Sequence, residues 1–410
     1  MTGRLNGRQW TLLILLVVSI FLNYIDRSNL SLAAPVMQRE FSLSTTAMAR
    51  LFAAFFWTYA LLQLVGISGW VADRYPVGWV LAGALFLWSI ATALTGLVTA
   101  FWAMFAMRLL VGAGESLAYP CYSRIFATDL PAESRGRANA LLDAASKMGP
   151  ALGTLLGGTL LIRTGWRAFF IVLGVASLLW LLPWFVWMPR DARPTDAISS
   201  GPGLIEILRS RSAWGAFFGH FCGNYFWFFL LTWLPVYLVN ERGFSMAHMV
   251  SISSTAYFLV AGGTLAAGWI SDACIARGWS ISNVRKAVVV CGLTSSTVLL
   301  PVPAIQDQGI SVILLFIACV GFGTYTSNHW AITQTLAGPL AAARWTSLQN
   351  GFGNLSGIAA SWLTGVAVER THSFVIAFAI AAVVALVGAV MWGAVVGPVQ
   401  EVRWRKAAAA

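Results

Sequence analysis

Long apolar stretches follow one another along the whole 410-residue chain, with short polar connections between most of them. A helix needs about 20 apolar residues to cross the hydrocarbon core of a bilayer. Only 10% of the residues are charged, against roughly 25% in a soluble protein. The stretches therefore predict an all-α membrane protein that has no room for a sizeable soluble domain.

The breaks in hydropathy predict twelve transmembrane helices. The expected spans are 11–35, 44–67, 79–98, 101–124, 138–161, 167–189, 213–239, 247–270, 285–304, 309–334, 347–368 and 374–397. The first span could imitate a signal peptide, but Asp26 and Arg27 fall where such a peptide is uncharged. We expect a six-helix bundle at 1–189, a polar cytoplasmic linker at 190–211 and a second six-helix bundle at 212–410.

The two expected bundles repeat each other in sequence. Gly69-x-x-x-Asp73 returns as Gly268-x-x-x-Asp272, Asn23-Tyr24 as Asn224-Tyr225, and Tyr59 as Tyr257, at offsets of 199, 201 and 198 residues. Nearly constant offsets indicate a duplication, and six intervening spans give the two copies the same orientation in the membrane.

The net charge of +11 has two interpretations, nucleic-acid binding or the positive-inside bias of a membrane protein. If the N-terminus is cytoplasmic, seventeen Lys and Arg residues lie on the cytoplasmic side and six on the opposite side. This asymmetry predicts that both termini are cytoplasmic. It also accounts for the basic balance without nucleic acid, because the cations do not gather on a soluble face.

Six charged side chains remain assigned to the membrane interior once the cations near the span ends are given to the two sides, and all six lie in the first half of the chain. They are the acids Asp26, Glu115 and Asp143 and the bases Arg27, Arg108 and Lys147. Ionisable groups inside a bilayer are costly, so they indicate a functional site. The second half offers only uncharged or weakly basic candidates: His220, Asn224, Tyr225, Tyr257, Tyr325, Ser327, Asn328, His329, Asn350 and Asn354.

These residue types suit the binding of an anion together with protons. Arg27 is a candidate anchor for a carboxylate, because guanidinium binds carboxylates in a bidentate manner, and the alternative is a structural ion pair. Asp26 and Glu115 are candidate proton carriers. Arg108 precedes Glu115 by seven residues, two turns of the same helix face, and could act on its charge or serve as a fixed brace.

Asp143 and Lys147 are spaced i, i+4 with the acid first, the favourable order for an ion pair. A local pair and a substrate role for Lys147 are equally open. With all six groups ionised the charges balance, and protonation of Asp26 and Glu115 leaves a net +2 that attracts an anion. This count predicts coupling of anion and proton movement.

Two motifs resemble the major facilitator superfamily. Gly69-Trp70-Val71-Ala72-Asp73-Arg74 is similar to the signature loop between its second and third helices, and Gly268-Trp269-Ile270-Ser271-Asp272 to the second copy. Tyr75-Pro76-Val77 departs from the usual ending of that loop. The resemblance implies twelve transmembrane helices in two pseudo-symmetric bundles around a central cavity that opens alternately to each side.

Three further segments resemble the anion:cation symporter family, which includes bacterial galactonate, glucarate and hexuronate transporters and is similar to animal sialin and vesicular glutamate transporters. The segments are Asn23-Tyr24-Ile25-Asp26-Arg27, Phe56-Trp57-Thr58-Tyr59 and Gly112-Ala113-Gly114-Glu115-Ser116. The resemblance implies that Arg27 binds the substrate carboxylate, Asp26 and Glu115 carry protons, and Arg108 partners Glu115. It also implies that Tyr24, Tyr59, Ser327 and Asn354 contact the substrate.

Lys147 stands where the sugar-acid carriers have a neutral polar group such as Gln. This departure puts galactonate in doubt, and the extra cation favours a dianion as a hypothesis. We expect Asp73, Arg74 and Asp272, with Arg135, Arg137 and Arg344, to latch the outward-facing state.

The expected function is a proton-coupled importer of a sugar acid or similar carboxylate in the bacterial inner membrane. It would work as a monomer in the lipid bilayer, with protons as coupling ion and no cofactor, metal or nucleic acid. The alternative is an exporter or exchanger of aromatic or hydrophobic compounds. A membrane-embedded enzyme or a receptor is disfavoured, because the sequence has no catalytic constellation and no soluble output domain. The sequence leaves open the particular carboxylate, its charge and the proton stoichiometry.

Overall fold

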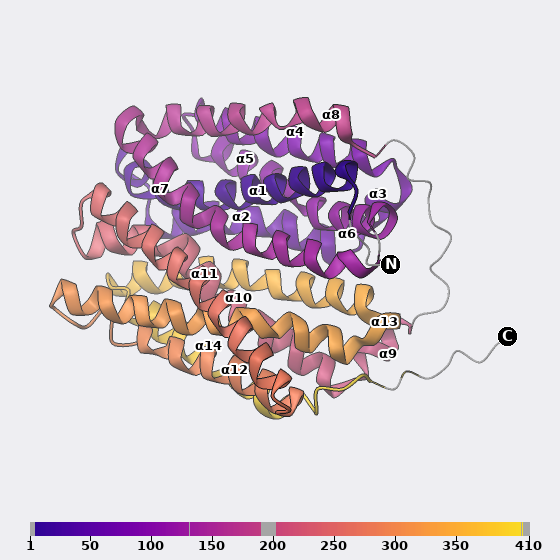
Figure 1. The fold of residues 1–410 in the computed structure, drawn as a ribbon. Coiled ribbons are helices and arrows are strands. Elements are labelled where there is room, and N and C mark those ends of the chain that lie inside the picture. Colours follow the sequence, from indigo (N-terminus) through magenta and orange to yellow (C-terminus); the bar gives the residue numbers. More distant parts are fainter. Residues whose placement is uncertain (1–4, 131, 190–201, 403, 405–410) are drawn as a thin grey trace. The chain divides into compact units, whose positions relative to one another are not determined.

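The computed structural model describes residues 5–130, 132–189, 202–402 and 404, and every regular element in these residues is a helix (Figure 1). In the first part of the chain these are α1 (Gly7–Glu40), α2 (Thr45–Leu64), α3 (Ile67–Arg74), α4 (Val77–Thr95), α5 (Phe101–Ser116), α6 (Ala118–Asp129), α7 (Ala132–Leu179) and α8 (Leu181–Trp187). Then follow α9 (Leu204–Leu208), α10 (Arg211–Val236), η1 (Tyr237–Glu241), α11 (Met246–Ala276), α12 (Ile281–Ser296), η2 (Thr297–Leu299), α13 (Gln308–Thr371), α14 (Val375–Val390) and η3 (Met391–Val395).

Nine helices in the described residues are long and apolar enough to cross a membrane. The count rises to the predicted twelve once three features are considered. The helical stretch formed by α7 and α8 is counted once but holds two spans. The shorter α12 with η2 forms an eleventh span, and the later part of α13 forms the twelfth. Helices suit this setting because each satisfies its own backbone hydrogen bonds where there is no water.

Two glycines separate the spans that the long helices contain. Gly165 in α7 has φ 80° and ψ 166°, and Gly338 in α13 has φ 62° and ψ 177°. Side-chain-bearing residues avoid this region of backbone conformation, so a glycine is needed for the chain to turn there. The connection between the tenth and eleventh expected spans thus turns at Gly338, with helix on both sides.

Replacing Gly165 with alanine is expected to destabilise the protein by about 1–3 kcal/mol, because an alanine would be strained in the positive-φ backbone conformation of this position. An added Cβ would meet no atom within 4 Å there, so the effect isolates the backbone. Gly83, in the middle of α4 with the same open surroundings, is the matched control. Gly83→Ala is expected to stabilise by about 0.5–1 kcal/mol. Thermal unfolding in detergent measures both, and equal effects would contradict the strain.

The predicted fourth span is two helices, since α5 ends at Ser116 and α6 begins at Ala118. Pro120 has no N–H to donate to the carbonyl of Ser116, four residues earlier. The Gln63 side chain donates to that carbonyl oxygen instead, at 3.1 Å. A side chain from α2 thus replaces the lost helical hydrogen bond.

The chain divides into two compact units. The first contains Met1–Thr195 and Leu231–Ser254, and the second contains Asp196–Leu230 and Thr255–Ala410. The predicted bundles at 1–189 and 212–410 remain a prediction. Residues 190–201 of the predicted linker lie outside the described residues, and its described part holds the short helix α9.

Small residues let the helices of the first unit approach one another closely. A Cβ on Gly149 would lie 2.8 Å from Cβ of Tyr24, and a Cβ on Gly153 would lie 2.8 Å from Cγ1 of Ile25. Gly149 and Gly153 therefore face α1, while Gly157 faces Phe169 of its own long helix. In Figure 1, α1 and α7 lie side by side in this unit. The contact fixes the helix turn that carries Tyr24, Asp26 and Arg27.

Candidate functional site

A buried ion pair lies within the first unit. Nε of Arg27 on α1 donates to Oε2 of Glu115 on α5 at 2.9 Å, and the two side chains are 3% and 0% exposed. Nη2 of Arg27 and Oε1 of Glu115 are also buried, and neither has a hydrogen-bond partner among the described residues. The pair thus leaves donor capacity on the guanidinium that a carboxylate could use.

Aromatic rings surround the Arg27 guanidinium. Its central carbon lies 4.6 Å from the ring centre of Tyr24 and 4.5 Å from that of Tyr59. The ring of Phe55, one turn before Tyr59 on α2, lies at 5.3 Å. The faces of these rings attract a cation, and they help to hold it inside the protein. The structure therefore brings the predicted Tyr24 and Tyr59 together with Arg27.

Asp26 is completely buried beside Arg27 on α1. Its Oδ1 accepts a hydrogen bond from Nδ2 of Asn29 at 3.3 Å. Its Oδ2 is buried and has no hydrogen-bond partner among the described residues. A buried ionised carboxylate is costly without donors or a cation against it. This environment suits a carboxyl group that binds and releases a proton.

The structure differs from the expectation for Arg108. Glu115 forms its ion pair with Arg27, from another helix, whereas Arg108 forms no ion pair in the described part of the chain. Arg108 is 5% exposed, lies 5.2 Å above the ring of Phe55, and acts electrostatically on both Glu115 and Asp26. Two turns of helix separate Arg108 from Glu115, whereas the guanidinium of Arg27 lies directly against the Glu115 carboxylate.

Phe55 was not predicted as a site residue, although it lies against both buried guanidinium groups. Its position is fixed by Gly112 of α5, where an added Cβ would collide with the carbonyl oxygen of Phe55. Thr58 also donates to the carbonyl oxygen of Leu109 at 2.8 Å, which ties α2 to α5. A phenylalanine in an apolar helix carries no sequence signal that separates this role from packing.

Lys147 pairs with Asp143 on α7, as the i, i+4 spacing predicted, with 3.7 Å between Nζ and Oδ1. The side chains are 15% and 38% exposed, so this pair is more accessible than the pair of Arg27 and Glu115. The more open setting keeps both interpretations of Lys147 in place.

The polar candidates of the second unit form short networks within and between helices. Ser271 of α11 donates to Oδ1 of Asn328 at 2.9 Å, and Nδ2 of Asn328 donates to the Ser327 hydroxyl at 2.8 Å. Nδ2 of Asn354 donates to the carbonyl oxygen of Asn350 at 2.8 Å. Ser327 and Asn354, predicted as substrate contacts, thus make local hydrogen bonds in this structure.

Among the predicted gating residues, Arg74 ends α3, Asp272 lies near the end of α11, and Arg344 lies within α13. The side chains of Asp73, Arg135 and Arg137 lie outside the described residues, and Arg74 and Asp272 are exposed. The first signature segment forms α3, and the second lies within the last turns of α11. Arg124, 8% exposed, donates to the carbonyl oxygen of Ala72, and also to that of Tyr75 at 3.1 Å. Arg124 was not predicted as a site residue.

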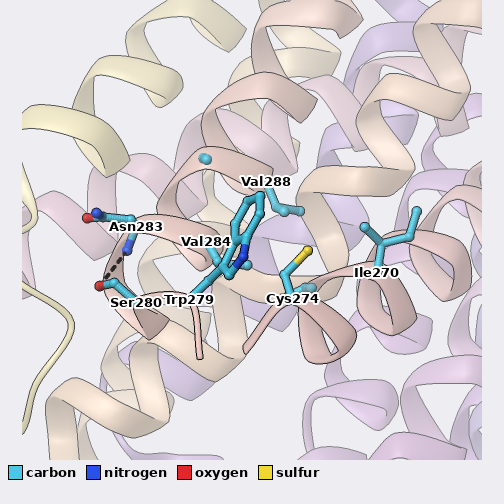
Figure 2. A pocket seen from close by; sticks show the side chains of 9 residues that line it. Ile270, Cys274, Trp279, Ser280, Asn283, Val284 and Val288 are labelled. Atoms are coloured by element: carbon cyan, nitrogen blue, oxygen red, sulfur yellow. Dashed lines mark hydrogen bonds between the residues drawn. The ribbon is translucent and has the colours of Figure 1, made fainter. Parts of the chain in front are cut away.

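A pocket of about 460 Å³ lies where α11 and α12 meet, with the ring of Trp279 standing across it (Figure 2). Its lining is almost entirely apolar, and it includes none of the predicted site residues. The lining residues are Ile270, Ser271, Cys274, Trp279, Ser280, Asn283, Val284, Ala287 and Val288. Within the described residues, no three His, Cys, Asp or Glu side chains gather as metal ligands.

Known proteins resemble this chain along almost its entire length. The model of the Major Facilitator Superfamily matches residues 16–361. The probable galactarate/D-glucarate transporter GarP of Escherichia coli (strain K12) is 30% identical, over 98% of this chain and 97% of GarP. The D-galactonate transporter of Escherichia coli O6:H1 is 28% identical, over 96% of this chain and 97% of that protein.

Among solved structures, a bacterial homologue of the human lysosomal transporter Spinster, in an inward-facing and occupied conformation, superposes with a TM-score of 0.74. Its sequence identity is 18%, over 96% of this chain and 95% of that chain. At this identity the likeness is one of fold.

Proposed function

Because this chain belongs to the Major Facilitator Superfamily, we propose that it is a proton-coupled symporter that imports a small organic anion by alternating access. The fold is the twelve-helix fold of that superfamily, and the chain is a multi-pass membrane transporter rather than an enzyme. The substrate is an organic anion, a sugar acid or another carboxylate. This class is supported by relatives described as carriers of galactarate, D-glucarate and D-galactonate.

The observation that carries the proposal is the buried Arg27 with its aromatic cage. Its Nε is engaged by Glu115, while its Nη2 is buried without a hydrogen-bond partner among the described residues. A substrate carboxylate would bind this remaining edge of the guanidinium, and the hydroxyl groups of Tyr24 and Tyr59 would orient it. Ser327 and Asn354 remain proposed contacts to the polar groups of the substrate.

Proton coupling follows from the charges of the same cluster. Arg27, Arg108, Asp26 and Glu115 are all buried, and their charges balance when all four are ionised. Protonation of both acids leaves two uncompensated cations, which favours entry of an anion. Loss of the protons on the cytoplasmic side restores the balance and weakens the hold on the anion. The proton is thus the proposed coupling ion, with no cofactor.

The rest of the proposal concerns orientation and gating. The excess of Lys and Arg in one set of connections supports cytoplasmic termini in the bacterial inner membrane. Asp73, Arg74 and Asp272 would latch the outward-facing state, and Arg124 would hold the backbone of the first latch through the carbonyl groups of Ala72 and Tyr75. One chain would suffice for transport.

The alternative function is an exporter or exchanger of aromatic or hydrophobic compounds. The aromatic lining around Arg27 fits such compounds, but a second buried guanidinium at Arg108 does not suit a lipophilic cation. Uptake of labelled galactarate, in competition with galactonate and with a lipophilic cation, distinguishes the two. Competition by the sugar acids alone supports the symporter, and competition by the lipophilic cation alone supports the alternative.

Lys147→Gln is expected to reduce the preference for a dianion over a monoanion by about tenfold. A partly exposed cation contributes about 1–2 kcal/mol to a second carboxylate, and each 1.4 kcal/mol is a factor of ten. Galactarate has two carboxylates and galactonate has one, so the ratio of their uptake rates is the measurement. Asp143→Asn, which removes the partner of Lys147 and keeps the cation, is the control. An unchanged ratio in Lys147→Gln would remove Lys147 from the substrate site.

A further inference from the structure

The pocket between the end of α11 and the start of α12 has a polar end and an apolar end. Its volume of about 460 Å³ falls within the range of about 300–1,000 Å³ that is usual for small-molecule sites. Ser280 and Asn283 lie together at the start of α12. Figure 2 shows them on one side of the Trp279 ring and Ile270 of α11 on the other. The hydroxyl of Ser271, at the apolar end, donates to Asn328.

The two ends of the pocket match the two layers of a membrane leaflet. From their connection at 277–280, α11 and α12 both lead into apolar spans. Tryptophan rings gather where the hydrocarbon core meets the headgroups, and Trp279 at this connection is exposed. The polar end of the pocket therefore lies at headgroup level, and the apolar end lies at the level of the acyl chains.

The apolar end of the pocket is open to lipid. Trp269 and Ile270 of α11 are 76% and 63% exposed, and Ala287 of α12 is also exposed. Large apolar side chains exposed on a membrane span face the acyl chains of the bilayer. An acyl chain can thus enter the pocket from the bilayer without passing through water.

The charges at the polar end favour an anion. Between residues 270 and 288 the chain has three cations, Arg277, Arg285 and Lys286, and one acid, Asp272. Nζ of Lys286 donates to the carbonyl oxygens of two residues near the C-terminus. Arg277 is exposed, and it lies between Cys274 and Trp279, which both line the pocket. A guanidinium binds a phosphate group through several N–H donors.

We propose that this pocket binds one anionic phospholipid, with an acyl chain against Val284, Ala287 and Val288 and the phosphate against Arg277. A zwitterionic lipid has no net charge, so the excess of cations discriminates against it. In the orientation proposed above, the site lies in the cytoplasmic leaflet, whose surface is negative. It shares no residue with the proposed substrate site, and it gives the second unit a lipid as a partner.

Photocrosslinking in vesicles tests the site directly. The full-length protein is reconstituted into phosphatidylcholine vesicles that contain a small fraction of phosphatidylglycerol with a photoreactive diazirine in one acyl chain. Mass spectrometry of the peptides then identifies the labelled residues. We expect the strongest labelling between residues 270 and 288. An excess of unlabelled phosphatidylglycerol is expected to suppress it, while the same excess of zwitterionic phosphatidylethanolamine is not.

Two variants and their matched controls distinguish a binding site from lipid that merely surrounds the protein. Arg277→Gln is expected to lower labelling of the pocket about fivefold, the contribution of one arginine near a membrane surface. Ala287→Trp fills the pocket from an exposed position and is expected to abolish its labelling. Arg209→Gln, at an exposed arginine directly after α9, and Val383→Trp, at an exposed position of α14, are expected to leave it unchanged.

Three results would overturn the lipid site. They are even labelling of all exposed apolar faces, equal competition by phosphatidylethanolamine, and unchanged labelling of the pocket in Arg277→Gln. Labelling of the exposed face of α14 in the same sample is the internal reference for folded protein. The readout needs no transport, so its result is independent of the function proposed above.

Discussion

Arg27→Ala is expected to lower uptake of the organic anion by about a hundredfold or more. The substitution removes the proposed carboxylate anchor and leaves Glu115, 0% exposed, without its ion-pair partner. Truncating one partner of a buried charge pair between a protein and its ligand costs about 3–5 kcal/mol of binding free energy, which corresponds to a factor of a hundred or more. Uptake of labelled galactarate into proteoliposomes measures the loss.

A matched double variant separates loss of the anchor from loss of the fold. Arg27→Ala alone is expected to unfold at a lower temperature, because it leaves a buried charge. Adding Glu115→Gln removes that charge, so the double variant regains thermal stability and still fails in counterflow of labelled anion, an exchange that Glu115→Gln alone retains. Arg167→Ala breaks the exposed pair with Glu40, whose side chains are 42% and 39% exposed, and is expected to transport normally. Counterflow in the double variant would contradict the role of Arg27.

Glu115→Gln is expected to abolish accumulation driven by a proton gradient while exchange of substrate continues. The glutamine side chain retains an oxygen acceptor for Nε of Arg27 but cannot bind or release a proton at neutral pH. For one proton per substrate, a gradient of one pH unit supports about tenfold accumulation, because each pH unit is about 1.4 kcal/mol. We expect Glu115→Gln to show no accumulation under this gradient.

Counterflow of labelled against unlabelled substrate, without a gradient, is the control for Glu115→Gln. It tests binding and alternating access without net movement of protons. Accumulation that persists in the variant would remove Glu115 from the coupling pathway and leave Asp26 as the remaining candidate. Loss of both accumulation and counterflow would assign Glu115 to the structure of the site instead.

The membrane fold could be predicted from the sequence because the length of the apolar stretches decides which segments can span the bilayer. The resemblance to the superfamily is confirmed, and the twelve predicted spans correspond to helical segments of the structure. Their ends were less predictable. Gln63 satisfies the carbonyl of Ser116 that Pro120 leaves free where α5 gives way to α6, and Gly338 turns the chain with helix on both sides. Both depend on the three-dimensional surroundings rather than on hydropathy.

The charged members of the candidate site could be found from the sequence because a buried charge in an apolar helix is rare. Their pairing could not, since helical spacing relates Arg108 to Glu115 while the fold brings the side chain of Arg27 on α1 to Glu115 on α5. Phe55 and Arg124 were missed because one looks like core and the other like a cytoplasmic cation.

The internal pH of proteoliposomes during substrate entry tests the central claim most directly. The protein is reconstituted into vesicles with an inward proton gradient. Hexonates, hexuronates, aldarates and aromatic acids are then added one class at a time, and Arg27→Ala vesicles are measured in parallel. Acidification with sugar acids, lost in Arg27→Ala, is the result that proton-coupled symport through Arg27 predicts. Entry of a sugar acid without any acidification would contradict it and would mean a uniporter or an exchanger.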